Sequence, residues 1–327
     1  FCHNVAPFLD ANPAAAPDAR FKALAGTHRS SPNPRETEAT AGGLYAFQSA
    51  DGLRWTPLHD GPVIREADFA FDSQNVSFWS EAEGCYVCYY RSWRTVHGKL
   101  RTISRATSPD FVHWTPAVDM NPNRPGEHLY TSQTHPYFRA PHLYIALPTR
   151  YQPDRGSSTD ILFMTARAGA NRFERLFPEA YIRPGLDPAR WGNRSNYAAC
   201  GVVPTGPAEM SLYHAHSGQR YTLRTDGFVS IRAGAAPGEL RTRPLIVSGR
   251  ELVLNLSTAA GGGARVELQT ATGAPIPGYT LSDCPPLVGD RIAFPVAWTG
   301  GADLGGLAGR PVRLRIELAE ADLYSLQ

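Results

Sequence analysis

The sequence is short of cysteine, of charge and of long apolar runs. Its 327 residues include 5 cysteines, and 19% are charged, against about 25% in an average globular protein. The 32 basic and 30 acidic residues leave a net charge of only +2, and no basic run stands out, so nucleic acid is not an expected partner. No stretch approaches the roughly 18 consecutive apolar residues of a transmembrane helix, which predicts a soluble chain with no membrane partner.

Several common chemical motifs are missing as well. The sequence has no glycine-rich phosphate loop, no G-x-S-x-G and no H-E-x-x-H, which argues against nucleotide chemistry, serine hydrolysis and helical zinc proteolysis. Cys85 and Cys88 have the C-x-x-C spacing, but they lie in a β-like run, where side chains three apart point to opposite faces. His214 and His216 share a strand face without an obvious third ligand. We therefore expect no metal and no cofactor.

The chain begins at Phe1 and shows no charged segment followed by an apolar one, as a signal peptide would. We interpret it as a processed chain or a fragment. Localisation stays open on this reading, with a secreted or periplasmic protein as one option if an upstream signal was removed. The oligomeric state is open too.

A repeat organises the first two thirds of the chain. The segment SADGLRWTP at 49–57 recurs as SPDFVHWTP 59 positions later, at 108–116, and a third copy ends at Phe173. Each copy follows a β-like run, so each unit is a strand, a turn and an anchoring aromatic. We predict that Asp51 and Asp110 form turns, and that Trp55 and Trp114 lie in the core between units.

A second repeated element lies between these hairpins. The segments 72–79 and 131–138 correspond at the same spacing, a third copy begins at 194–197, and 3–8 is similar. We call these polar segments the start segments, because each precedes an expected inner strand, near residues 4, 74, 133 and 196. Units of four short antiparallel strands at this spacing predict a β-propeller, with four blades clearly visible and five as the expected type.

The pattern of apolar and polar residues changes after residue 225. Leucines alternate with other residues at 252–256, a longer alternation covers 312–318, and turn signals stand at 261–263, 272–273, 289–290 and 300–301. Short alternating strands over about 100 residues predict a β-sandwich. The expected protein is all-β, with a propeller domain at 1–225 and a C-terminal sandwich at 226–327. The best helical candidate is the short segment 14–24.

This combination resembles the five-bladed β-propeller glycoside hydrolases of families 32, 43 and 68. The likeness is carried by the hairpins SADGLRW (49–55) and ATSPDFVHW (106–114), by the Phe71-Asp72 start segment and by the appended sandwich. The resemblance implies hydrolysis of a glycan at the central funnel, with carboxylates near the starts of inner strands. The family motifs N-D-P-N-G, R-D-P and W-E-C-P are absent.

Three carboxylates are the catalytic candidates under this resemblance. Asp72 is the acidic residue at an equivalent start segment, and its alternative role is a strand cap. Glu127 precedes the start segment at 131–138, with a solvated loop carboxylate as the alternative. Asp187 precedes Pro188, a pairing that also favours a plain turn.

Side chains that can hydrogen-bond or stack on a sugar are the substrate-binding candidates. We expect Arg194 to keep Asp72 ionised, and Trp191 to offer a stacking platform. The full set is Asn4, Gln74, Asn75, Gln133, His135, Trp191, Arg194 and Asn196.

The leading interpretation is a glycosidase that acts on an oligo- or polysaccharide through paired carboxylates. The alternatives are a non-catalytic glycan-binding propeller and a protein-interaction scaffold. Two carboxylates within about 5 to 10 Å at the funnel mouth favour hydrolysis, a single one favours binding, and a flat apolar top favours the scaffold.

Overall fold

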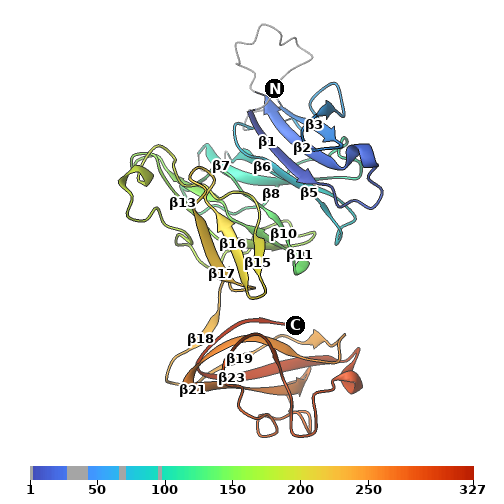
Figure 1. Ribbon diagram of the computed structural model, residues 1–327, viewed down its shortest axis with the longest axis vertical. Coiled ribbons are helices and arrows are strands. Elements are labelled where there is room, and N and C mark those ends of the chain that lie inside the picture. The colour runs from blue at the N-terminus through green and yellow to red at the C-terminus, as the bar shows by residue number, and fades with distance from the viewer. Residues whose placement is uncertain (1–2, 28–42, 66–70, 95–97) are drawn as a thin grey trace. The chain divides into compact units, whose positions relative to one another are not determined.

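The computed structural model describes residues 3–27, 43–65, 71–94 and 98–327, and it is all-β (Figure 1). The only helical elements within these ranges are three short 3₁₀ turns, η1 (Pro17–Ala19), η3 (Pro188–Arg190) and η4 (Gly305–Leu307). None of the described helices has the length and apolar character needed to cross a bilayer. The chain divides into two compact units, one of Phe1–Val203 with Leu212–Tyr221 and one of Pro204–Ser211 with Thr222–Gln327.

Two four-stranded antiparallel sheets open the first unit. Their strands pair in chain order, which is the arrangement predicted for one repeat. The first sheet contains β1 (His3–Leu9), β2 (Phe21–Thr27), β3 (Gly43–Ser49) and β4 (Thr56–Pro57). The second contains β5 (Val76–Ser80), β6 (Cys85–Arg94), β7 (Leu100–Ser108) and β8 (Val118–Asp119).

The best helical candidate, 14–24, does not form an α-helix, as fits a chain expected to be all-β. Only η1 forms there, and β2 begins at Phe21. Pairing with β1 on one side and β3 on the other gives this segment two ladders of hydrogen bonds, and it buries Ala23 and Leu24 completely. Tertiary pairing thus overrides a weak local helix preference.

The third repeat is divided between two sheets. One contains β10 (His135–Tyr137), β11 (Ala140–Ala146) and β14 (Met164–Arg167), with a single bridge from Thr165 to Glu174 in place of a fourth strand. The β11–β14 hairpin continues as β12 (Thr149–Gln152) and β13 (Ser158–Ile161), and β12 pairs with β9 (His128–Leu129). The sequence did not predict this second sheet.

The fourth expected inner strand is displaced. β1, β5 and β10 begin within two residues of their expected starts. At 196, however, the chain forms only an isolated bridge between Ala198 and His214. The next sheet contains β15 (Val203–Gly206), β16 (Glu209–Tyr213) and β17 (Arg220–Arg224). Side-chain hydrogen bonds from Asn196 to the Thr159 and Arg190 carbonyls take the place of a ladder there.

The second sheet is buried on both faces, which explains the apolar sequence of β6. Tyr86 and Cys88 pack in a cluster with residues of the first sheet, such as Leu24 and Leu44. Val87 points the other way, into a cluster with residues of the third repeat. The sequence prediction that Cys85 and Cys88 point to opposite faces is confirmed, because Cys85 packs against the second cluster.

The repeated hairpins have matching turns. The Asp51 and Asp110 carboxylates each accept backbone N–H bonds from residues two and three positions ahead, so their predicted turn role is confirmed. The predicted core position of the two tryptophans is wrong, because Trp55 and Trp114 are only half-buried. The buried aromatic of the second hairpin is Phe111, with Trp114 against it at a ring-centroid distance of 5.5 Å.

The second unit contains one six-stranded sheet. It is built on two long antiparallel strands, and the predicted alternation is confirmed at 312–318, where every second residue is buried. At 254–256 the intervening Asn255 is buried as well. The expected turn at 261–263 is wrong. A Cβ on Gly262 would lie 2.5 Å from the Glu320 carbonyl oxygen, so glycine lets the strand pass through a bulge. The strands are β18 (Ile231–Ala233), β19 (Gly238–Arg241), β20 (Leu245–Ile246), β21 (Val253–Thr270), β22 (Asp290–Pro295) and β23 (Pro311–Leu326).

Candidate functional site

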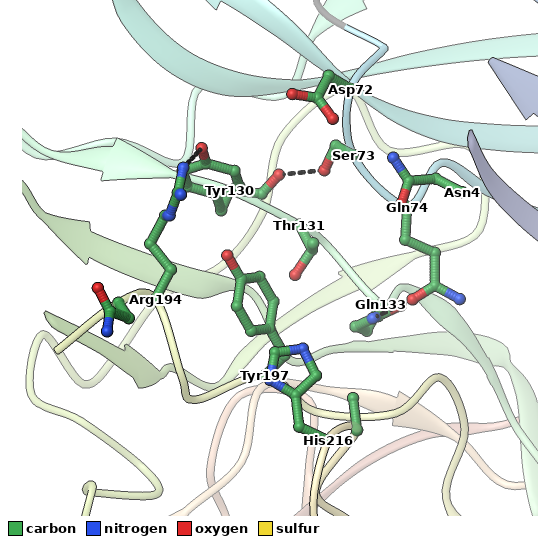
Figure 2. A pocket seen from close by; sticks show the side chains of 12 residues that line it. Asn4, Asp72, Ser73, Gln74, Tyr130, Thr131, Gln133, Arg194, Tyr197 and His216 are labelled. Carbon is green, nitrogen blue, oxygen red and sulfur yellow. Dashed lines mark hydrogen bonds between the residues drawn. The ribbon is translucent and has the colours of Figure 1, made fainter. Parts of the chain in front are cut away.

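A polar pocket lies in the first unit where the start segments meet (Figure 2). Its volume is about 360 Å³, within the range of roughly 300 to 1,000 Å³ found for ligand sites. Segments 72–74, 130–133 and 193–197 all contribute, together with residue 4 from the first repeat, so residues of all four repeats meet at this pocket. The lining residues are Asn4, Asp72, Ser73, Gln74, Tyr130, Thr131, Gln133, Asn193, Arg194, Tyr197, Ala215 and His216.

Gln133 ties three start segments together. Its Nε2 donates to Gln74 Oε1 at 2.6 Å and to the Ala198 carbonyl at 2.9 Å. Gln74 and Gln133 occupy the same position in the 59-residue repeat, so two related residues bond to each other. Ser73 Oγ also donates to the Tyr130 carbonyl. Gln133 Oε1 is buried and has no hydrogen-bond partner among the described residues, which leaves a fixed acceptor beside the pocket.

Several non-glycine residues with left-handed backbone conformation line this pocket. Of nine described non-glycine residues with positive φ, four line it: Asn4 (59°), Gln133 (50°), Asn193 (51°) and Arg194 (55°). Such conformations are uncommon outside glycine. They persist where the surroundings enforce them, and they cluster at ligand sites. This concentration marks the pocket as the candidate functional site.

One wall of the pocket is aromatic. The Tyr130 and Tyr197 rings meet edge to face at 6.1 Å, and the Tyr197 and His216 rings lie 5.2 Å apart. Burial raises the pKa of Tyr197 to about 12, so its hydroxyl remains protonated and can donate at neutral pH. Arg194 Nη1 donates to the Tyr130 hydroxyl at 3.3 Å, and Figure 2 shows both side chains on this wall, across the pocket from Gln74.

Asp72 is exposed and supplies the single carboxylate among the described lining residues. The sequence predicted Arg194 as its partner, but the described interactions of Arg194 run to tyrosines. The cation beside Asp72 is Arg91. Burial lowers the pKa of Arg91, and the Asp72 charge opposes that change. The expected effect of Arg194 on Asp72 therefore stays a prediction.

Two predicted sugar ligands have structural roles. Asn75 is buried, donates to the Phe71 and Ser73 carbonyls and accepts the Arg91 backbone N–H. Asn196 is also buried. Its Nδ2 donates to the Thr159 and Arg190 carbonyls, and its Oδ1 accepts a hydrogen bond from Arg190 Nε. Neither lines the pocket. Their amides replace backbone partners at the ends of strands.

The other two predicted catalytic carboxylates lie outside the pocket lining. Glu127 is buried, and both its oxygens accept hydrogen bonds from Arg175, at 2.5 and 2.9 Å. Asp187 is exposed and caps η3 by accepting the Ala189 N–H at 2.9 Å. The structure thus does not bring Asp72, Glu127 and Asp187 together.

Two ring residues that the sequence selected also lie outside the lining. His135 Nδ1 lies 2.9 Å from the Gln133 carbonyl, and burial lowers the pKa of its imidazole. Trp191 is 57% exposed, and its Nε1 donates to the Gly185 carbonyl. Sequence reasoning did not select Tyr130, which occupies the repeat position of Phe71. That aromatic register was the signal that could have found it.

No known protein family matches the sequence, and no curated protein matches it. Among solved structures, the chain is similar to an endo-arabinase from Bacteroides thetaiotaomicron, with 12% identity, a TM-score of 0.46 and coverage of 68% of this chain and 74% of that one. It is also similar to a thermostable family-43 glycoside hydrolase, with 11% identity, a TM-score of 0.43 and coverage of 67% and 69%. A third is an α-L-arabinanase from Penicillium chrysogenum complexed with arabinobiose, with 13% identity, a TM-score of 0.39 and coverage of 66% and 60%. The predicted resemblance to glycoside hydrolases is confirmed, and at such identities it concerns the fold alone.

Proposed function

We propose that the first unit binds carbohydrate in the pocket at the start segments. The observation that carries this proposal is the lining itself: amides, hydroxyls, a guanidinium and one carboxylate, beside two tyrosine rings. Sugars present many hydroxyls, each a donor and an acceptor, around a ring with an apolar face. Amide and hydroxyl side chains match the first property, and aromatic rings match the second.

The same proposal includes the architecture predicted from the sequence. We propose that the first unit is a five-bladed type of β-propeller with four visible blades, over about 1–225, and that 226–327 is a β-sandwich. Support for the propeller comes from the two four-stranded sheets, from the cores on both faces of the second sheet and from the start segments that Gln133 joins. For the sandwich, support comes from one continuous core beneath the six-stranded sheet.

Binding is favoured over hydrolysis by the carboxylate count. Glycosidic cleavage requires a protonated carboxyl on the leaving oxygen and an ionised one on the opposite side of the sugar. Asp72 is the one carboxylate among the described lining residues, while Arg175 holds both oxygens of Glu127 and Asp187 caps a turn. One carboxylate can orient a sugar through its hydroxyls without breaking the glycosidic bond.

Hydrolysis is the second candidate, and one observation favours it. The position equivalent to Asp72 in the next repeat is the neutral Thr131, so strand geometry does not require an acid there. An acid at the pocket mouth then has a reason in the ligand or the reaction.

The test is calorimetric titration of the full chain with a panel of neutral and acidic oligosaccharides, arabino-oligosaccharides included, alongside an assay for new reducing ends. We expect binding that falls at least tenfold in Tyr197→Ala and Gln74→Ala. The matched control is Phe138→Ala, an exposed aromatic outside the lining, which should bind as the wild type does. Reducing ends that disappear in Asp72→Asn would establish hydrolysis instead. A panel in which no saccharide binds would refute both candidates.

A further inference from the structure

Three arginines surround one tyrosine of the pocket. The guanidinium carbons of Arg91 and Arg101 lie 5.1 and 4.8 Å from the centroid of the Tyr130 ring. Arg194 approaches the same residue from the pocket side and donates to its hydroxyl. Cation–π contact of this kind is electrostatically favourable, but it does not neutralise the charge of any of the three arginines.

Two of the three arginines lack a carboxylate partner among the described residues. Asp72 lies beside Arg91, whereas none of the described ion pairs includes Arg101 or Arg194. Arg101 instead lies over the Trp93 and Tyr151 rings, at 4.9 and 5.3 Å, and its buried Nε has no hydrogen-bond partner there. Arg101 is half-buried, and a partly desolvated cation without a counter-charge costs free energy, so an anion supplied by a ligand would stabilise the cluster.

The pocket lining has one guanidinium and one carboxylate, from Arg194 and Asp72, so the excess positive charge comes from Arg91 and Arg101 beside Tyr130. Asp72 is the one lining carboxylate in the described ranges, and it lies beside Arg91. Arg194 is exposed on the wall, and the Tyr130 hydroxyl accepts from only one of its terminal nitrogens. The remaining N–H donors of the Arg194 guanidinium match a carboxylate or sulfate best, because two N–H donors can bind two oxygens.

We infer that the saccharide of this pocket is acidic, and that Arg194 binds its carboxylate or sulfate oxygens while Arg91 and Arg101 add positive potential from behind Tyr130. This inference rests on the proposed function, since it specifies the sugar class for the same pocket. Asp72 then faces hydroxyls and not the anionic group, because two negative charges in one small pocket repel each other.

The experiment compares three oligosaccharides of equal length by calorimetric titration of the full chain: a uronic-acid oligomer, the same oligomer with its carboxyls reduced to alcohols, and a sulfated neutral oligomer. At about 50 mM salt we expect at least one acidic form to bind tenfold or more tightly than the reduced form. The preferred form identifies the anion as carboxylate or sulfate. The advantage should shrink at about 0.5 M salt, because the screening length falls well below the roughly 10 Å found at 0.1 M.

Variants locate the effect. Arg194→Gln should lose the acidic preference, so that the acidic and the reduced oligomers bind this variant with equal affinity. Tyr130→Phe removes the hydroxyl that holds Arg194, so it should lose part of the preference. Arg54→Gln is the matched control, because it removes the same charge from a side chain that is 91% exposed in a remote hairpin. Melting temperatures verify that each variant is folded.

The outcomes separate the two proposals. Equal affinity for the acidic and reduced oligomers would overturn the acidic-sugar inference and leave carbohydrate binding intact. No binding of any oligomer would overturn both. An acidic preference that survives Arg194→Gln, or that Arg54→Gln removes equally, would overturn the assignment to Arg194.

Discussion

The substitution Glu127→Gln separates the two roles that sequence and structure give to this residue. The sequence made Glu127 a catalytic candidate, whereas the structure buries it in contact with Arg175, with Arg150 at 3.9 Å and with the Arg124 backbone N–H donating at 3.1 Å. Glutamine keeps the shape and one acceptor oxygen but removes the charge. Arg175, whose side chain is 8% exposed, would then be a buried cation without its counter-charge.

The cost follows from that loss. Removing one member of a buried ion pair typically destabilises by about 3 to 5 kcal/mol, and retention of shape and one hydrogen bond places our expectation near the lower value, about 3 kcal/mol. For a unit of this size, each kcal/mol lowers the melting temperature by roughly 2 to 4 °C, so we expect a fall of about 6 to 12 °C by calorimetry. Saccharide affinity, measured below the new melting temperature, should not change.

A matched control uses the exposed pair of Glu174 with Arg172, whose side chains are 58% and 74% exposed. Glu174→Gln should cost less than about 1 kcal/mol, as surface pairs do. If Glu127→Gln melts like the wild type yet loses binding or turnover, the structural assignment fails and the catalytic one is right.

Three further outcomes are expected. The hydrogen bond from the Arg54 backbone N–H lowers the pKa of Asp51 to about 2. Its stabilising effect is therefore present above the unfolded pKa of about 3.9 and is lost as the pH falls towards 2. An NMR titration that gives the Asp51 carboxyl an ordinary pKa would contradict this. Trp114→Ala should destabilise by about 1.5 to 3 kcal/mol and more than Trp55→Ala, since Trp114 alone packs against a hydrophobic cluster; equal thermal melts would count against it. Gly262→Ala should destabilise the second unit by about 2 kcal/mol or more in urea unfolding, because its Cβ would meet backbone oxygens of the facing strand; an unchanged midpoint would refute the bulge argument.

The parts of the fold that sequence predicted are those set by local periodicity. The 59-residue register placed the starts of β5 and β10 within two residues, and the alternation at 312–318 identified the buried face of β23. The division of the third repeat into two sheets was not predictable in this way. It depends on β12 pairing with β9, whose two residues carry no strand pattern of their own.

The site was less predictable because partners distant in sequence decide what a polar side chain does. Glu127 looks like a loop carboxylate until Arg175, 48 residues later, is placed against it. His135 looks like a ligand until its ring is found against the Gln133 carbonyl. In both cases the residue type was compatible with function, and burial beside one partner decided otherwise.

Backbone conformation divides the polar residues of the start segments into two groups. Asn4 and Gln133 have positive φ and line the pocket, whereas Asn75 and Asn196 do not and cap buried backbone. An amide in ordinary extended or helical conformation can serve the chain's own hydrogen bonds at little cost. A left-handed residue costs on the order of 1 to 3 kcal/mol and needs its surroundings to hold it. Four such residues around one pocket of about 360 Å³ are difficult to explain by folding alone, because capping is achieved nearby without strain. Pre-organisation of side chains for a ligand accounts for them, since groups already fixed in place lose less entropy on binding.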